Sequence, residues 1–119
     1  MIPQKNRLSR SQVASVIKKG KRLSSEHFNI KYLARTSKNH ATRQESRFCV
    51  VVSTKISPKA TERNRIRRQI FEAIAAEQTK IPLDIILFTK PSIKDLDFGR
   101  IKEEFAKILH KIASISTQQ

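Results

Sequence analysis

The hydrophobic positions of this chain follow two spacings, one typical of helices and one typical of strands. Apolar side chains recur three or four residues apart in three segments, which predicts helices at 11–20, about 58–77 and 98–113. Alternating or continuous apolar runs predict strands at 27–33, 47–53 and 84–88. The predicted fold is a single-domain α/β (α+β) sandwich with the order α-β-β-α-β-α.

Residues that favour helix ends stand next to all three predicted helices. Serine, threonine and aspartate are preferred N-caps because their side chains accept a hydrogen bond from a free backbone N–H. The candidates are Ser9 or Ser11, then Ser57 (followed by Pro58) or Thr61, and finally Asp95 or Asp97. Gly20 suits the position that ends the first helix. The polar segment 34–46 is predicted to be a loop, and 114–119 a frayed tail.

Four arginines and an asparagine crowd the start of the second predicted helix, in the run Arg63-Asn64-Arg65-Ile66-Arg67-Arg68. The apolar face of that helix consists of Ile66, Ile70, Ala73 and Ile74. At about 100° per residue, Asn64 and Arg68 point away from this face. Arg65 and Arg67 flank them, and Arg63 lies beside the apolar face.

The place of these arginines in the helix is informative. Cations in the first turns oppose the helix dipole, so the arrangement does not serve the stability of the helix. Free backbone N–H groups and guanidinium groups at one helix end instead favour the binding of an anion. The alternative is a basic helix face that is simply solvated.

The excess of positive charge lies in the first part of the chain. The 119 residues include 25 Lys and Arg against 10 Asp and Glu, for a formal net charge of +15. Residues 1–68 carry 18 basic and 3 acidic side chains, whereas 69–119 carry 7 of each. Such asymmetry predicts a polyanionic partner. Nucleic acid is the leading candidate, because its binding draws on phosphate neutralisation, and an anionic membrane surface is the competitor.

Other features of the composition favour a cytoplasmic protein. No apolar run approaches the roughly 18 residues that a membrane-spanning helix needs. Residues 1–7 lack the apolar segment of a secretory signal. The single cysteine, Cys49, excludes an intramolecular disulfide, and its apolar neighbours at 48–52 make it a candidate core residue.

The residue types of protein-borne catalysis are sparse. The three histidines are His27, His40 and His110. They fall in three different predicted elements, and none has a second ligand at metal-binding spacing. Two glycines are too few for a phosphate-binding glycine loop. We therefore predict no catalytic residue and no metal site in this chain.

With the arginine run in view, the sequence resembles the bacterial ribonuclease P protein component over nearly its whole length. The resemblance rests on Asn6-Arg7-Leu8, Lys18-Lys19-Gly20, Val50-Val51-Val52-Ser53-Thr54-Lys55 and Ala60-Thr61-Glu62 followed by the arginine run. It implies a ribosomal protein S5 domain 2-like fold with a left-handed β-α-β crossover, an exception to the usual hand.

The resemblance also implies a function. Proteins of that family join a catalytic RNA in a ribonucleoprotein endoribonuclease, which removes the 5′ leader of precursor tRNA during tRNA processing. The RNA carries the chemistry through bound Mg²⁺, and no cofactor is expected in the protein. The implied partners are the catalytic RNA and precursor tRNA, with no membrane and no requirement for a protein oligomer.

Two sets of site residues follow from the resemblance. The catalytic-RNA set is Arg63, Asn64, Arg65, Arg67 and Arg68, supported by Lys55 and Lys59. The set for the leader cleft is Val13, Ile17, Asn29, Lys31, Cys49 and Val51. The family often has phenylalanine at the positions of Val13 and Ile17, where an aromatic ring can stack on bases. Either leader binding is weaker here, or Phe28 or Tyr32 supplies the ring; alternatively, Val13, Val16 and Ile17 are only core.

Three other functions remain open from the residues. A general structured-RNA or ribosome-binding protein would share the basic surface without a role in processing. A nuclease acting by its own side chains is disfavoured by the missing acid–base or metal cluster. A membrane-surface protein needs an amphipathic helix with a free apolar face, but the apolar faces here are needed for a core.

Overall fold

The computed structural model describes residues 7–34, 47–77 and 83–117. Its elements in chain order are α1 (Arg10–Lys19), β1 (Lys21–Ser24), β2 (Phe28–Ala34), β3 (Arg47–Val51), α2 (Ala60–Glu77), β4 (Leu83–Thr89), the 3-10 helix η2 (Pro91–Asp95) and α3 (Phe98–Thr117). The three predicted helices and three predicted strands are all present, so the α/β class is confirmed.

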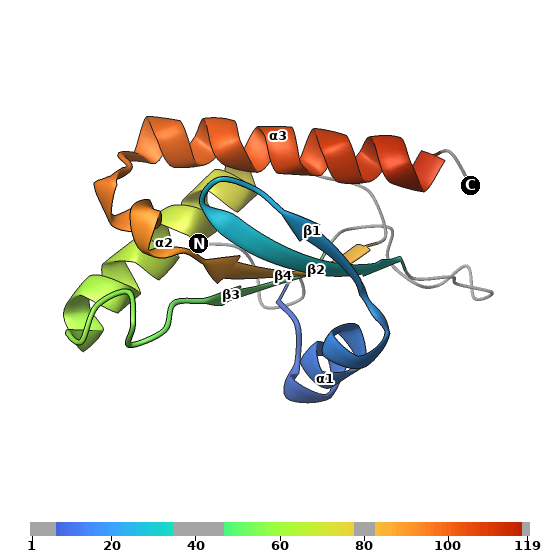
Figure 1. The fold of residues 1–119 in the computed structure, drawn as a ribbon, viewed down its shortest axis with the longest axis horizontal. Coiled ribbons are helices and arrows are strands. Elements are labelled where there is room, and N and C mark those ends of the chain that lie inside the picture. The colour runs from blue at the N-terminus through green and yellow to red at the C-terminus, as the bar shows by residue number, and fades with distance from the viewer. Residues whose placement is uncertain (1–6, 35–46, 78–82, 118–119) are drawn as a thin grey trace.

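One four-stranded sheet organises the molecule, with the strand order β1-β2-β4-β3. β1 pairs with β2 and β2 with β4 in antiparallel fashion, whereas β3 and β4 run parallel and are joined through α2. Figure 1 shows α2 and α3 over one face of the sheet and α1 on the opposite side. The left hand expected for the β3-α2-β4 crossover stays a prediction.

The main core lies between the sheet and the helices α2 and α3. Alternate strand residues such as Phe28, Ile30 and Val50 point into it and meet the apolar faces of both helices. The rings of Phe48 and Phe105 pack edge to face with centroids 5.7 Å apart. Because side chains alternate along a strand, the intervening residues point to the α1 side.

A second, smaller apolar contact holds α1. Val16 of α1 and Ile86 of β4 are both fully buried, yet neither belongs to the main cluster. The predicted capping by Ser9 is confirmed, since its side chain accepts a hydrogen bond from the Gln12 N–H and the Gln12 side chain accepts one from the Ser9 N–H.

Gly20 ends α1 as predicted, but for a different reason. Its backbone is extended, with φ of −73°, so no left-handed conformation is involved. A Cβ atom at this position would lie 2.4 Å from the Val16 carbonyl oxygen and 3.0 Å from that of Tyr32. Glycine is therefore needed because the chain passes so closely between α1 and β2.

The other helix starts differ in detail from the prediction. α2 begins at Ala60, between the two predicted starts; Ser57 is buried, and its hydroxyl accepts a hydrogen bond from the Lys59 N–H. Asp97 caps α3 by accepting from the Arg100 N–H at 2.9 Å. Asp95 instead ends η2.

Two elements were missed, and most element boundaries differ by a few residues. β1 has the sequence Lys-Arg-Leu-Ser, without a strand-like apolar pattern, and forms because β2 supplies its hydrogen-bonding partners. η2 follows β4, in a segment for which no element was predicted. β3 ends at Val51 instead of residue 53. The helix α3 continues to Thr117, so the predicted frayed tail is wrong for 114–117. Of the predicted loop, residue 34 belongs to β2 and 35–46 lie outside the described residues.

Candidate nucleic-acid interface

The first turns of α2 present the predicted basic surface, which we call the arginine surface: Arg63, Asn64, Arg65, Arg67 and Arg68. The apolar residues Ile66, Ile70, Ala73 and Ile74 are buried in the main core, as the helical spacing predicted. This burial turns Asn64, Arg65 and Arg68 to solvent and leaves Arg63 and Arg67 half-buried. The five side chains therefore form one continuous face of one helix.

Hydrogen bonds orient two members of the arginine surface. Arg63 Nη1 donates to the carbonyl oxygen of Ser57 at 2.9 Å, which ties the helix to the connection before it. Arg67 Nη1 donates to Asn64 Oδ1 at 2.8 Å, so the Asn64 NH₂ group remains free to donate outward. Among the described residues, Arg65 and Arg68 have no carboxylate partner. Their guanidinium groups are available to a phosphate.

Lys55 and Lys59 extend this positive charge along the connection that precedes α2. Both side chains are exposed. Lys55 lies in the turn after β3, and Lys59 directly precedes the helix, with its carbonyl oxygen accepting the Arg63 N–H at 3.1 Å. The seven residues of the predicted catalytic-RNA set thus lie on α2 and the segment leading into it.

The sheet brings together the strand residues predicted for the leader cleft. Strand register places Asn29, Phe88 and Val51 in one row across β2, β4 and β3. The next row is Lys31, Ile86 and Cys49. These rows point away from the main core, to the side that carries α1. We call this surface the α1 face of the sheet.

The α1 residues of the predicted cleft border this face without being buried in it. Val16 is the fully buried residue of the helix, whereas Val13 is half-buried and Ile17 is 46% exposed. Val13 and Ile17 are therefore not simply core residues. Lys31 Nζ donates to the Ile17 carbonyl oxygen at 3.1 Å, so this lysine links β2 to the last turn of α1. A cation there also complements the helix dipole.

The expectation that Phe28 or Tyr32 supplies an aromatic surface is wrong. Both are buried in the main core, at 0% and 5% exposure, because their positions on β2 face α2 and α3. The aromatic residue on the α1 face is Phe88, which is half-buried. Sequence reasoning missed it because the run 84–88 was read as uniformly buried. Ile85, Ile86, Leu87 and Phe88 are all apolar, so only the pairing of β4 with β2 and β3 shows which of them face α1.

Phe88 lies in an open groove with a volume of about 470 Å³. The groove is also lined by Arg22 and Ser24 of β1 and by Asn29 and Lys31 of β2. Ser24 Oγ donates to Asn29 Oδ1 at 3.2 Å. An aromatic ring beside two cations and an amide matches what single-stranded nucleic acid requires, which is base stacking with nearby phosphate partners.

Cys49, in β3, brings one residue of the α1 face within electrostatic reach of the arginine surface. Burial raises the pKa of the Cys49 thiol, and the positive charge of nearby Arg67 acts in the opposite direction. The guanidinium of α2 is therefore close to a residue of the α1 face. Since its pKa is raised, Cys49 is a neutral thiol and not an activated nucleophile.

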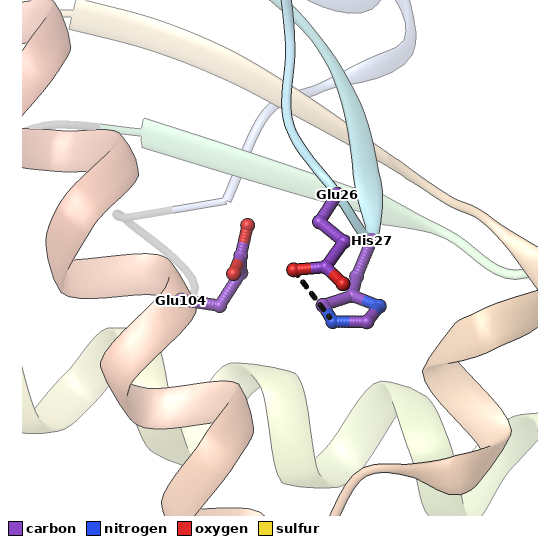
Figure 2. A group of neighbouring side chains, drawn as sticks. All are labelled: Glu26, His27 and Glu104. Carbon is purple, nitrogen blue, oxygen red and sulfur yellow. Dashed lines mark ion pairs between the residues drawn. The ribbon is translucent and has the colours of Figure 1, made fainter.

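A third group of polar side chains lies apart from both surfaces. Glu26, His27 and Glu104 come together from the β1–β2 turn and α3, as Figure 2 shows. The spacing of residues in the sequence predicted no such grouping, because 77 positions separate His27 from Glu104. None of the described helices has the length and apolar character needed to cross a membrane.

The comparisons with known proteins agree on one family. The model of the family described as Ribonuclease P matches residues 2–113. The chain is 37% identical over 68 residues to a ribonuclease P protein component from Idiomarina loihiensis and 35% identical over 69 residues to one from Nitrosomonas eutropha. These alignments cover 56% and 57% of the chain. They span 54% and 57% of the relatives, so the chain spans little more than half the length of the curated relatives it matches.

Solved structures agree with the fold. A mutant RNase P protein from Staphylococcus aureus superposes with a TM-score of 0.77 at 23% identity, covering 93% of this chain and 90% of the other. The RNase P protein from Thermotoga maritima gives 0.74 at 24% identity, covering 88% and 96%. At such identities the likeness concerns the fold.

Proposed function

We propose, since this chain belongs to the Ribonuclease P family, that it is the protein subunit of a ribonucleoprotein endoribonuclease that removes the 5′ leader of precursor tRNA. The observation that carries this proposal is that one chain presents two different surfaces, the arginine surface and the α1 face. One presents guanidinium groups on a rigid helix, and the other presents an aromatic ring and cations in a groove. The two surfaces suit a structured RNA and a single strand respectively.

The arginine surface is assigned to the catalytic RNA. Guanidinium groups bind phosphate oxygens through paired N–H donors, which fixes orientation as well as charge. The Arg63 contact to Ser57 and the Arg67 contact to Asn64 hold two of these side chains before RNA arrives. Such preorganisation lowers the conformational entropy that binding would otherwise cost.

The α1 face is assigned to the single-stranded leader. Phe88 offers a ring on which a base can stack, and Arg22 and Lys31 stand beside it as phosphate partners. Val13 and Ile17 do not line this groove, and their assigned part is to extend the leader surface with apolar contacts from α1. Stacking tolerates any base, so this surface would hold leaders of different sequences.

Bond cleavage is assigned to the RNA partner and its bound Mg²⁺. The residues of the two surfaces are hydrogen-bond donors, cations and apolar groups, which position phosphates. Their contribution is to hold the precursor and the catalytic RNA in one orientation, which is a recognised source of rate acceleration.

Cleavage of precursor tRNA by the cognate catalytic RNA, with and without this chain at low millimolar Mg²⁺, tests the proposal. We expect a large rate increase with the protein and no cleavage by the protein alone. Tight RNA binding without a rate increase would refute the proposal and favour a general structured-RNA-binding protein on the same fold.

A further inference from the structure

Three metal-ligating side chains converge where the β1–β2 turn meets α3. Glu26 and His27 lie in the turn, and Glu104 extends from the helix toward them (Figure 2). One ligand atom from each of the three residues can be chosen so that all lie within 4.8 Å of one another. Neither RNA-binding surface described above includes these residues.

The spacing of His27 Nε2 and Glu26 Oε2 suits a shared ion better than a direct hydrogen bond. His27 Nε2 lies 3.8 Å from Glu26 Oε2, beyond the range of a hydrogen bond. Zinc lies about 2.0–2.2 Å from nitrogen and oxygen ligands, so two ligands of one zinc ion are roughly 3–4 Å apart. Glu26 has an 80% exposed side chain, which leaves its carboxylate free to adjust.

The histidine is already oriented for such a role. Its Nδ1 lies 2.8 Å from the Ser92 hydroxyl on η2, and its side chain is only 13% exposed. When Nδ1 carries the proton and donates to Ser92 Oγ, the lone pair of Nε2 faces the glutamates. Metal-binding histidines commonly use their second ring nitrogen in this way. The His27 carbonyl oxygen also accepts the Lys90 N–H at 2.9 Å, which anchors the turn.

The charges around the group favour a cation. Within the described part of the chain, neither Glu26 nor Glu104 forms an ion pair with a lysine or arginine. Lys90, whose N–H anchors the turn, directs its ammonium group to the Ser24 hydroxyl and the Ser25 carbonyl oxygen. Two neighbouring carboxylates repel each other, and a divalent ion between them removes that repulsion.

We propose that Glu26, His27 and Glu104 bind a late first-row divalent ion, with Zn²⁺ as the representative. One imidazole and two carboxylates are three of the four ligands of a tetrahedral zinc site, and water supplies the fourth. Mg²⁺ is a poor occupant because it prefers oxygen ligands in octahedral geometry. The bound ion would join the β1–β2 turn to α3, independently of the function proposed above.

Calorimetric titration of the full chain with Zn²⁺, in the presence of excess Mg²⁺, tests this site directly. We expect one Zn²⁺ per chain, a rise in Tm, and the visible absorption of tetrahedral Co²⁺ when Co²⁺ replaces Zn²⁺. His27→Gln and Glu104→Gln should each weaken binding by more than about tenfold, and Ser92→Ala by roughly 10–100-fold. His110→Gln and Glu103→Gln alter exposed residues of α3 and serve as matched controls.

The results distinguish this site from adventitious binding and from a plain ion pair. Equal affinity in wild type and His27→Gln would overturn the proposal, as would loss of binding in His110→Gln. Absence of stoichiometric binding would also overturn it and leave only the contact between Glu26 and His27. Far-UV circular dichroism without metal checks that each variant folds. If His27→Gln does not fold, Glu104→Gln provides an independent test of the site.

Discussion

Replacing Phe88 by leucine should weaken binding of the 5′ leader without changing its electrostatics. Phe88 is the aromatic residue of the α1 face, and leucine keeps an apolar side chain of similar size. The cost to folding should stay below about 1.5 kcal/mol. A folding defect would weaken binding of every ligand, so a loss of affinity confined to the leader would have to come from the missing ring.

The magnitude follows from how much of the ring is accessible. Stacking of a base on an aromatic side chain contributes about 1–3 kcal/mol. Phe88 is half-buried, so only part of its ring can contact a base. We therefore take the lower end, about 1 kcal/mol, which corresponds to a roughly fivefold increase in Kd.

The assay compares two ligands of the assembled ribonucleoprotein: precursor tRNA with a single-stranded leader, and the same tRNA without it. Phe88→Leu should raise Kd about fivefold for the first ligand and leave the second unchanged. The dependence of Kd on salt should stay the same, because no charge is removed. Phe98→Leu, at the exposed start of α3, is the matched control.

Three results would refute this reasoning about Phe88. An unchanged affinity for the leader-bearing tRNA would mean that no base stacks on the ring. An equal loss for both ligands would indicate damage to the fold or to the arginine surface. A changed salt dependence would indicate that the substitution had displaced Arg22 or Lys31.

Three further predictions concern charge and the buried thiol. Arg65→Ala should lower affinity for the catalytic RNA and reduce the slope of log K against log salt by about one unit, measured by filter binding at several salt concentrations. Asp84→Ala should destabilise the fold in urea denaturation, because Asp84 is 5% exposed and accepts two 2.8 Å hydrogen bonds from Arg47. The Arg47 side chain is 25% exposed, so we expect about 2–3 kcal/mol, below the roughly 3–5 kcal/mol of a fully buried pair. Alkylation of Cys49 at pH 8, followed by mass spectrometry, should be slower than that of a free thiol, since only the thiolate reacts and burial raises its pKa. Arg67→Ala removes the opposing charge, raises that pKa further and should slow alkylation again.

Exposed residues of the scaffold provide controls for these variants. Arg100→Ala on α3 should leave the salt dependence of RNA binding unchanged. If it reduced the slope as much as Arg65→Ala does, Arg65 would have no special role. Glu72→Ala on α2 should cost far less stability than Asp84→Ala, since Glu72 is exposed. Faster alkylation of Cys49 in Arg67→Ala would contradict the inference that the arginine charge lowers the pKa of this thiol.

The hydrophobic pattern gave correct predictions where one side of an element had to be apolar. The spacing of Ile66, Ile70 and Ile74 determined which side of α2 is buried. The placement of the arginines on the remaining surface of the helix followed from that. Ser9 could be identified as a cap because capping depends on only a few neighbouring residues. Such features rest on contacts within a few positions of the chain.

Features that depend on distant parts of the chain could not be predicted in the same way. β1 has no apolar alternation and exists because β2 lies beside it. Whether Phe28 or Phe88 faces α1 is decided by strand register across the sheet. The meeting of His27 with Glu104 depends on how α3 lies over the β1–β2 turn. In each case the missing information was tertiary.

The small apolar contact under α1 implies that this helix detaches from the sheet more easily than α2 or α3. The free energy of a local opening depends on the contacts that are lost, and the described residues that hold α1 include one fully buried residue, Val16, and the Lys31 bond to Ile17. Amide hydrogens of α1 should therefore exchange faster than those of the main core. A single-stranded RNA leader bound between α1 and the sheet would slow that exchange. Part of its binding free energy would then go into holding α1, one wall of the cleft, against the sheet.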